Sequence, residues 1–297
     1  MIKVKFLGTS GAVPTAERNH TSMLLEYENE NILIDCGEGT QRQFRKARIN
    51  PCKITRILIT HWHGDHVLGL PGLLQTLGFS EYNKTLYIYG PKGTKEFMQN
   101  LFKTFFFQGK CPIEIKEVEG KFFETEDFYI EAEQMTHGIP CNAYNFVKKN
   151  QIRINKTKLK KTPLEGPIIG KLKQGKDVIY QGKKYLAKNL TYKEEGRKIS
   201  FVLDTSFNSK IIPFVKDSNL LICESTFDEE MKEKAGDYKH LTASQTAEIA
   251  KKAKAKKLIL THISQRYNKN LKKIIEQAKK IFKDSTIAKD FEIIEIK

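Results

Sequence analysis

Short hydrophobic runs recur along the first third of the chain and are separated by turn residues, a pattern typical of alternating strands and helices. Segments 3–7, 22–26, 32–35 and 56–60 are either continuously apolar or alternate apolar and polar positions, which predicts strands. Helices are predicted at 40–48, after the turn Gly37-Glu38-Gly39, and in the stretch that ends near residue 79.

The same rhythm continues to the end of the chain with one interruption. Before it, the pattern predicts a helix at 92–102 and strands at 86–89, 113–118, 128–134 and 143–147. After it, helices are predicted at 242–253 and 270–282, and strands at 199–203, 219–223, 257–261 and 291–296. Two such runs predict an α/β fold in which the layers form an αββα sandwich.

The interruption is a strongly basic segment. Between residues 148 and 188 there are thirteen basic and two acidic residues, a local net charge of +11, while the whole chain carries +16. A general bias toward lysine would spread the charge evenly, so its concentration here favours a polyanionic partner. Proline and glycine are frequent in the segment and bulky apolar residues are few, which predicts an insertion that projects from the domain and is not part of its core.

The remaining composition narrows the class of protein. Hydrophobic residues make up 39% and charged residues 29% of the chain, and no stretch approaches the roughly 18 apolar residues of a membrane span. The alternating start MIKVKFL predicts a first strand and not a signal peptide. The cysteines contain no C-x-x-C pair, so we interpret them as buried hydrophobes in a cytoplasmic protein: Cys36, Cys52, Cys111, Cys141 and Cys223.

The chemistry of the chain centres on the motif His61-Trp62-His63-Gly64-Asp65-His66. In an extended chain, residues two apart point the same way, so His61 and His63 can bind one ion together. Gly64 allows the backbone to turn, after which Asp65 and His66 can face a second ion. Imidazoles and carboxylates suit zinc, and a site without thiolates keeps positions open for water.

Further metal ligands are expected where other predicted strands end. His137 and His262 each follow a strand, and so does Asp204. Open α/β folds place their sites at such strand ends. Each of these residues, taken alone, could equally be a polar residue of a surface turn. Together with the motif they provide seven candidate ligands for two metal ions.

The order of these residues resembles the ligand series of the metallo-β-lactamase superfamily. That resemblance implies that His61, His63 and His137 bind one zinc ion, that Asp65, His66 and His262 bind the other, and that Asp204 bridges the two. The superfamily spans many hydrolytic activities, so the series alone does not identify a substrate.

Further segments resemble the ribonuclease Z family in its short form. They are Phe6-Leu7-Gly8-Thr9-Ser10-Gly11, Pro14-Thr15-Ala16-Glu17-Arg18-Asn19, Asp35-Cys36-Gly37-Glu38-Gly39-Thr40-Gln41, His240-Leu241-Thr242 and His262-Ile263-Ser264-Gln265-Arg266-Tyr267. Leu203 departs from the glycine that the family often has before the bridging aspartate. The resemblance spans the whole chain and implies one domain over residues 1–297. It also implies a zinc-dependent endoribonuclease that removes the 3′ trailer from precursor tRNA.

The resemblance also implies a mechanism in which two zinc ions per subunit supply a hydroxide at neutral pH. Asp65 would orient the water and accept its proton. His240 is the candidate to donate a proton to the leaving 3′ oxygen or to stabilise the phosphate, although it could instead be a residue at a helix start with no role. Glu224 could orient or polarise a histidine. The products would be a 3′-hydroxyl on the tRNA and a 5′-phosphate on the trailer.

The basic insertion, residues 148–192, resembles the flexible arm with which this family binds tRNA. The lysines expected to contact the RNA are Lys156, Lys158, Lys160, Lys161, Lys171 and Lys173. The family works as a homodimer, so a homodimer is expected here. Two alternatives remain open: a small-molecule hydrolase of the same fold, such as a phosphodiesterase, and a non-catalytic RNA-binding relative.

Overall fold

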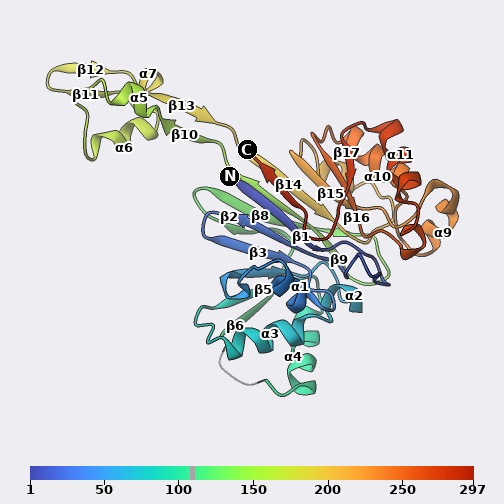
Figure 1. The fold of residues 1–297 in the computed structure, drawn as a ribbon. Helices are drawn as coiled ribbons and strands as arrows, with labels where there is room; N and C mark the ends of the chain where they lie inside the picture. The colour runs from blue at the N-terminus through green and yellow to red at the C-terminus, as the bar shows by residue number, and fades with distance from the viewer. Residues whose placement is uncertain (108–110) are drawn as a thin grey trace. The chain divides into compact units, whose positions relative to one another are not determined.

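Two seven-stranded sheets form the framework of the chain in the computed structural model, which describes residues 1–107 and 111–297 (Figure 1). Contacts divide the chain into two compact units. The larger unit comprises Met1–Phe123, Ile130–Phe146 and Lys198–Lys297, and the smaller comprises Glu124–Tyr129 and Val147–Arg197.

The first sheet has the strand order β18-β1-β2-β3-β4-β5-β6. Its strands are β1 (Ile2–Gly8), β2 (Ser22–Tyr27), β3 (Glu30–Ile34), β4 (Arg56–Leu58), β5 (Leu86–Gly90), β6 (Ile113–Glu117) and β18 (Ile293–Ile296). The associated helices are α1 (Thr40–Lys46), η1 (Pro51–Lys53), α2 (Gly64–Val67), α3 (Leu70–Phe79) and α4 (Thr94–Thr104). β3 to β6 run parallel, so the carboxyl ends of β3, β4 and β5 lie at the same edge.

The second sheet has the order β17-β16-β15-β14-β9-β8-β7. Its strands are β7 (Gly120–Glu124), β8 (Phe128–Met135), β9 (Cys141–Lys148), β14 (Arg197–Val202), β15 (Leu220–Glu224), β16 (Leu258–Thr261) and β17 (Ser285–Ile287). The associated helices are α8 (Ile211–Phe214), η2 (Glu229–Met231), α9 (Lys232–Asp237), α10 (Ala243–Lys252), η3 (Gln265–Tyr267) and α11 (Leu271–Ile281). β14 to β17 are parallel, so their carboxyl ends also share an edge.

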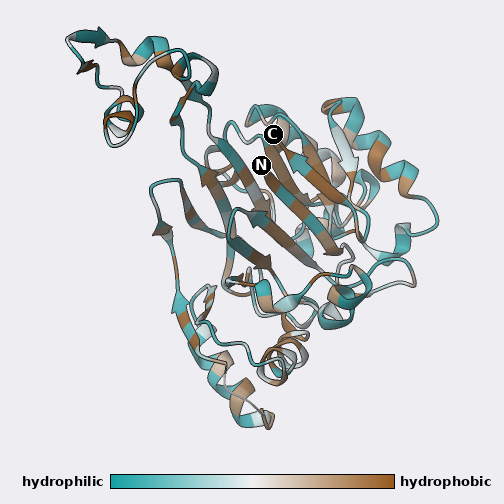
Figure 2. Cartoon of the chain, turned by 60° about the vertical axis from the view of Figure 1, so that its left-hand side comes forward, coloured by the Kyte–Doolittle hydropathy of each residue, from teal (hydrophilic) through white to brown (hydrophobic). Residues whose placement is uncertain are grey.

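The two sheets pack face to face and helices cover their outer faces, which confirms the predicted αββα layers (Figure 1). Between the sheets, the ring of Tyr27 lies 5.5 Å from that of Phe146, and the Tyr144 hydroxyl donates to the carbonyl of Ile59 at 2.7 Å. One outer core joins Phe44, Leu73 and Met98 to the first sheet, and α10 and α11 form another core on the second. The central strands of the two sheets are mostly apolar, and brown predominates along them in Figure 2.

The smaller unit contains its own apolar core. Its elements are β10 (Gln151–Ile154), α5 (Lys156–Leu159), α6 (Ile168–Lys173), β11 (Val178–Tyr180), β12 (Lys183–Tyr185), α7 (Ala187–Leu190) and β13 (Thr191–Glu194). β10 pairs with β13 and β11 with β12, both antiparallel. The buried residues are Leu164, Leu172, Val178, Ala187 and Leu190. These few apolar residues therefore suffice to order a segment that the sequence predicts only as an insertion outside the main core.

Most predicted elements are present, with ends shifted by a few residues. The pattern did not predict β7, β17 or α9. Each of these elements is too short to show a clear helical or strand periodicity. All five cysteines are free, and Cys36, Cys141 and Cys223 are buried as expected. Cys52 and Cys111 are only partly buried and pack against the edge of the outer core on the first sheet. Among the described residues, no helix is long and apolar enough to cross a membrane.

Candidate metal centre and active site

The candidate site lies at the carboxyl ends of strands from both sheets. Asp35 directly follows β3 and His262 directly follows β16, while Asp204 lies two residues after β14. All three have positive φ angles, of 55°, 56° and 45°. Non-glycine residues rarely adopt this left-handed conformation, and such strain concentrates at functional sites. Here the left-handed conformation turns the chain sharply at the end of each strand, and the three side chains point into the site.

The motif after β4 places its residues as alternation predicts. His61 and His63 face the site, and Trp62 between them points the other way, where its indole N–H donates to the Thr94 hydroxyl at 3.0 Å. The Trp62 ring stacks on Phe97 with 5.0 Å between ring centres. α2 then begins at Gly64 and carries Asp65 and His66 in its single turn. Packing of Trp62 against α4 thus fixes the direction of both neighbouring histidines.

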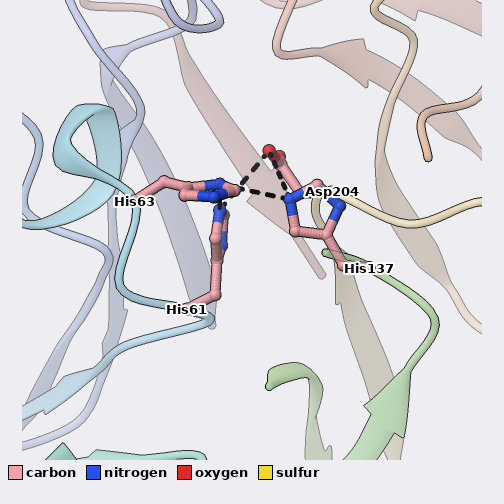
Figure 3. Close-up of side chains that lie close together, drawn as sticks. All are labelled: His61, His63, His137 and Asp204. Carbon is pink, nitrogen blue, oxygen red and sulfur yellow. Dashed lines mark hydrogen bonds and ion pairs between the residues drawn. The ribbon is translucent and has the colours of Figure 1, made fainter. Parts of the chain in front are cut away.

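The first ligand group consists of three histidines and one oxygen of Asp204 (Figure 3). His61 Nε2 lies 3.0 Å from His63 Nδ1, which lies 3.2 Å from His137 Nε2. Oδ2 of Asp204 lies 3.5 Å from His61 Nε2 and 4.0 Å from His137 Nε2. Four donor atoms therefore face one small volume from four directions.

The second ligand group lies against the other oxygen of Asp204. Nε2 of His66 and Nε2 of His262 are 3.2 Å apart, and each lies 3.3 Å from Oδ2 of Asp65. Oδ1 of Asp204 is 3.2 Å from His262 Nε2 and 3.5 Å from His66 Nε2. Asp204 thus presents one oxygen to each group. All seven residues expected as ligands therefore lie together in these two adjacent groups.

The chemistry of these atoms fits a bound cation. Oδ1 of Asp204 is buried and accepts no hydrogen bond from any residue in the described part of the chain. The imidazole nitrogens that face one another can each donate a lone pair to a metal ion, and a bound ion would satisfy them together. Burial, together with the charge on His66, holds the pKa of His61 well below its usual value, which favours the neutral form that binds metals. The cluster is therefore a metal-binding site.

Asp35 orients two of the histidines. Its carboxylate accepts from the backbone N–H and the hydroxyl of Thr60, both at 2.7 Å, and from Nδ1 of His66 at 2.6 Å. The Thr60 hydroxyl in turn accepts from Nδ1 of His61 at 3.1 Å. With each Nδ1 proton bound in this way, the Nε2 lone pairs of His61 and His66 point into the site.

His137 and His262 are held in the same manner. Nδ1 of His137 donates to the carbonyl of Lys239 at 3.2 Å. Nδ1 of His262 donates to the Thr226 hydroxyl at 3.0 Å, and that hydroxyl donates to Glu224 at 2.7 Å. Sequence reasoning assigned no role to Asp35, Thr60 or Thr226. Of these three residues, only Asp35 could have been recognised from the sequence, because it is a carboxylate at the end of a buried strand and lies within the D-C-G-E signature.

Glu224 and His240 form a buried pair beside the cluster. His240 Nδ1 lies 3.0 Å from Oε1 of Glu224. The same oxygen accepts from the backbone N–H of Thr205, and Oε2 accepts from the backbone N–H of Leu241. Burial alone would lower the pKa of His240, but the charge and hydrogen bond of Glu224 raise it to about 9. The His240 ring stacks on that of His262 at 5.5 Å, and the residue also approaches Asp204. The sequence led us to expect Glu224 to orient or polarise a histidine without indicating which one, and the histidine that it contacts is His240.

We expect the substitution Asp35→Asn to weaken metal binding by about 10- to 100-fold, the usual effect of removing a carboxylate behind a ligating histidine. Asparagine preserves the size of the side chain but removes the charge that fixes the ring of His66. Competition with a chromogenic chelator measures the affinity. Equal affinity in the native and substituted proteins would show that Asp35 has no part in metal binding.

The six lysines expected to contact RNA all lie in the smaller unit and are all exposed. Lys156 and Lys158 are on α5, Lys160 and Lys161 follow it, and Lys171 and Lys173 are on α6. In the described part of the chain, the ion pairs of this unit join Glu194 to Lys148 and Arg153, Asp177 to Lys184 and Glu124 to Lys149, and none of them uses the six lysines. The charge of the six lysines is therefore available to an external partner.

Comparison with known proteins identifies the family. Residues 2–150, which contain the His61–His66 motif and His137 but neither Asp204 nor His262, match a family model described as anti-Pycsar protein Apyc1. Over nearly the whole chain, the protein is 38% identical to ribonuclease Z of Nanoarchaeum equitans, covering 99% of this chain and 93% of the relative. It is 39% identical to ribonuclease Z of Methanothermobacter thermautotrophicus, covering 100% of this chain and 97% of the relative.

Solved structures agree with this result. The short form of human tRNase Z superposes with a TM-score of 0.74 at 28% identity and covers 99% of both chains. The metallo-β-lactamase fold protein YhfI from Bacillus subtilis superposes with a TM-score of 0.71 at 20% identity, covering 99% of this chain and 98% of the other. The fold is thus the metallo-β-lactamase fold. These ribonuclease Z relatives are 38–39% identical to the chain and cover nearly all of it, both ligand groups included, so the chain belongs to the ribonuclease Z family.

Proposed function

We propose that the protein is an endoribonuclease that removes the 3′ trailer from tRNA precursors and leaves a 3′-hydroxyl on the tRNA and a 5′-phosphate on the trailer. The observation that carries the proposal is Asp204, whose two oxygens each face one complete group of ligands. A site of this kind holds two metal ions against one phosphodiester. The full-length similarity to ribonuclease Z supplies the substrate.

We propose two zinc ions per subunit as the metals. His61, His63 and His137 would hold one ion and Asp65, His66 and His262 the other, with Asp204 between them. Five imidazoles and two carboxylates, with no thiolate, form a donor set that suits zinc. When bound, the ions would lower the pKa of a water molecule toward 7 and neutralise charge on the phosphate.

The side chains of the protein carry the proton transfers in this proposal. Asp65 orients the attacking water and accepts its proton, since it faces both His66 and His262 at the rim of the cluster. His240, held by Glu224, donates a proton to the departing 3′ oxygen. Its pKa of about 9 keeps it protonated at neutral pH, which is the form that a general acid needs. Glu224 acts through His240 as a positioning residue.

We propose that residues 148–192 are the arm that binds tRNA, inserted in one metallo-β-lactamase domain that spans residues 1–297. The six exposed lysines and the apolar core of the smaller unit support this role, because an ordered basic surface can contact phosphates in a fixed pattern. Duplex RNA is recognised largely by shape and by its phosphates, so such a surface suits a tRNA.

Replacing the six arm lysines (Lys156, Lys158, Lys160, Lys161, Lys171 and Lys173) with glutamine is expected to weaken tRNA binding and flatten its salt dependence. Each lost phosphate contact lowers the log–log slope by about 0.9. Binding titrations at several salt concentrations measure both quantities, and hydrolysis of a small phosphodiester should be unchanged.

A matched variant tests whether tRNA binding depends on the position of the lysines or only on the net charge of the protein. It replaces six exposed lysines of the larger unit: Lys251, Lys254, Lys256, Lys279, Lys280 and Lys283. This control should alter tRNA binding much less than the arm variant does. Equal losses in the two variants would mean that binding follows total charge and that the smaller unit is not the arm.

We also propose that the protein works as a homodimer in the cytoplasm. The family resemblance supports the dimer, as do exposed aromatic residues that a subunit contact would remove from water: Phe97, Phe102, Phe105 and Phe106 on and after α4. Five free cysteines support a reducing compartment. Sedimentation equilibrium measures the mass in solution, and a monomer at working concentration would contradict the dimer.

A small-molecule phosphodiesterase of the same fold is the alternative function. It would use the same seven ligands but would have no use for a basic unit of residues 148–192. The test of the proposal is incubation of a 3′-extended tRNA precursor with the metal-loaded protein, followed by mapping of the cut and of both new ends. We expect a single cut beside the discriminator nucleotide. Hydrolysis of small phosphodiesters with no cut in the precursor would support the alternative.

A further inference from the structure

A cleft of about 260 Å³ opens directly beside the metal-binding site in the larger unit. Its walls come from the loop after β1, the loop after β15, the end of α9 and the segment after β16. The lining side chains that matter here are Phe227, Lys234, Tyr238, His240 and Arg266. This volume is just below the roughly 300–1,000 Å³ of pockets that enclose drug-sized ligands, so it suits a single nucleoside.

The cleft combines aromatic rings with cations. Tyr238, at the end of α9 (Figure 1), is 61% exposed, and the ammonium of Lys234 lies 5.5 Å from the centre of its ring. The guanidinium carbon of Arg266 lies 5.2 Å from the centre of the Phe227 ring. Proteins that bind single-stranded nucleic acid use the same pairing, with bases stacked on aromatic rings and phosphates held by cations. The chemistry of the cleft therefore matches a nucleotide.

The position of His240 indicates which nucleotide. His240 lines the cleft, and in the proposed reaction it protonates the 3′ oxygen that leaves the phosphorus. That oxygen belongs to the last nucleoside of the tRNA, whereas the phosphorus stays with the trailer. Attacking and leaving oxygens lie in line on opposite sides of the phosphorus. The nucleoside on the His240 side is thus the last one of the tRNA.

We propose that this cleft binds the last nucleoside of the mature tRNA, with its base stacked on Tyr238 and its 5′ phosphate near Lys234 and Arg266. This inference rests on the proposed function. It assigns to Tyr238 a contact with substrate that is separate from the metal ligands and from the smaller unit. Stacking accepts any base, so the cleft does not require one particular base at this position.

Tyr238 allows a direct test because its ring is mostly exposed and its removal leaves no cavity in the core. The experiment measures kcat/KM for a 3′-extended precursor with the native protein, Tyr238→Ala and Tyr238→Phe. Phe291→Ala, which removes an aromatic ring that is 42% exposed outside the cleft, is the matched control. Loss of one stacking contact should lower kcat/KM by about tenfold or more in Tyr238→Ala. Tyr238→Phe and Phe291→Ala should remain close to native.

Substrates that lack single bases identify the nucleotide. One precursor is abasic at the last tRNA nucleotide and another at the first trailer nucleotide. The proposal predicts that Tyr238→Ala and native protein cleave the first substrate equally, while the full defect persists with the second. The reverse pattern would assign the cleft to the trailer, and an equal defect with both substrates would show that Tyr238 stacks on neither base; each overturns the proposal. If native protein cleaved no precursor at all, the proposed function itself would fail, a result distinct from these two.

Discussion

Replacing Asp204 with alanine is expected to lower the cleavage rate at least about 1,000-fold and to reduce the metal content from two ions per chain to one or none. Asp204 is the only residue with an oxygen in contact with each of the two ligand groups in the described part of the chain. Two-metal stabilisation of a phosphodiester transition state contributes several kcal/mol, and each 1.36 kcal/mol is about tenfold in rate. Elemental analysis and single-turnover cleavage measure the two effects.

Asp217→Ala is the matched control for this experiment. Asp217 also has a positive φ angle, of 58° against 45° for Asp204, but it is exposed and lies before β15, at the opposite end of the strand from the site. Any backbone strain introduced by alanine is therefore common to the two variants. Asp217→Ala should retain both metals and full activity. An Asp204→Ala protein with two metals and native rate would refute the bridging role.

The second large effect is expected for His240→Ala, which should slow cleavage by about 100- to 10,000-fold while both metals remain bound. This range is typical for removal of a general acid. His240 is held through Nδ1 by Glu224, and its ring lies over that of His262. Its proton can therefore reach a group bound at the metals without His240 itself being a ligand.

A substrate with sulfur in place of the bridging 3′ oxygen tests the proton directly. A thiolate leaves without protonation far more readily than an alkoxide, because a thiol has a pKa near 8.5. The defect of His240→Ala should therefore shrink with this substrate if His240 is the acid. An undiminished defect would assign His240 to phosphate binding. Loss of one metal would make it a ligand beside Asp204 and His262, a grouping that the geometry also permits.

Four of the seven candidate ligands could be identified from the sequence because they are close together in the chain. His61, His63, Asp65 and His66 lie within six residues, and alternation along an extended chain followed by one turn determines their directions. The αββα layers were predictable for a similar reason. Strand segments contain short apolar runs and helix segments repeat their apolar positions every three to four residues, so the two can be told apart locally. Family resemblance placed His137, Asp204 and His262 in the two groups.

The hydrogen bonds that orient the candidate ligands were harder to predict from the sequence. Asp35 is 25 residues from Thr60 and 31 from His66, so its role depends on pairing of β3 with β4. Thr226 connects Glu224 to His262 across two strand ends, which no local pattern reveals. The apolar core of residues 148–192 was missed because its five buried residues are spread over several short elements without periodicity. The cleft beside His240 likewise depends on four segments that meet only in the folded chain.

The most direct test of the account is single-turnover cleavage of a 3′-extended tRNA precursor in water enriched in a heavy oxygen isotope, with mass spectrometry of both products. If water is the nucleophile and the 3′ oxygen leaves, one heavy oxygen enters the 5′-phosphate of the trailer and none enters the 3′-hydroxyl of the tRNA. A 2′,3′-cyclic phosphate on the tRNA, with an unlabelled 5′-hydroxyl on the trailer, would contradict the account, because the ribose and not water would then be the nucleophile.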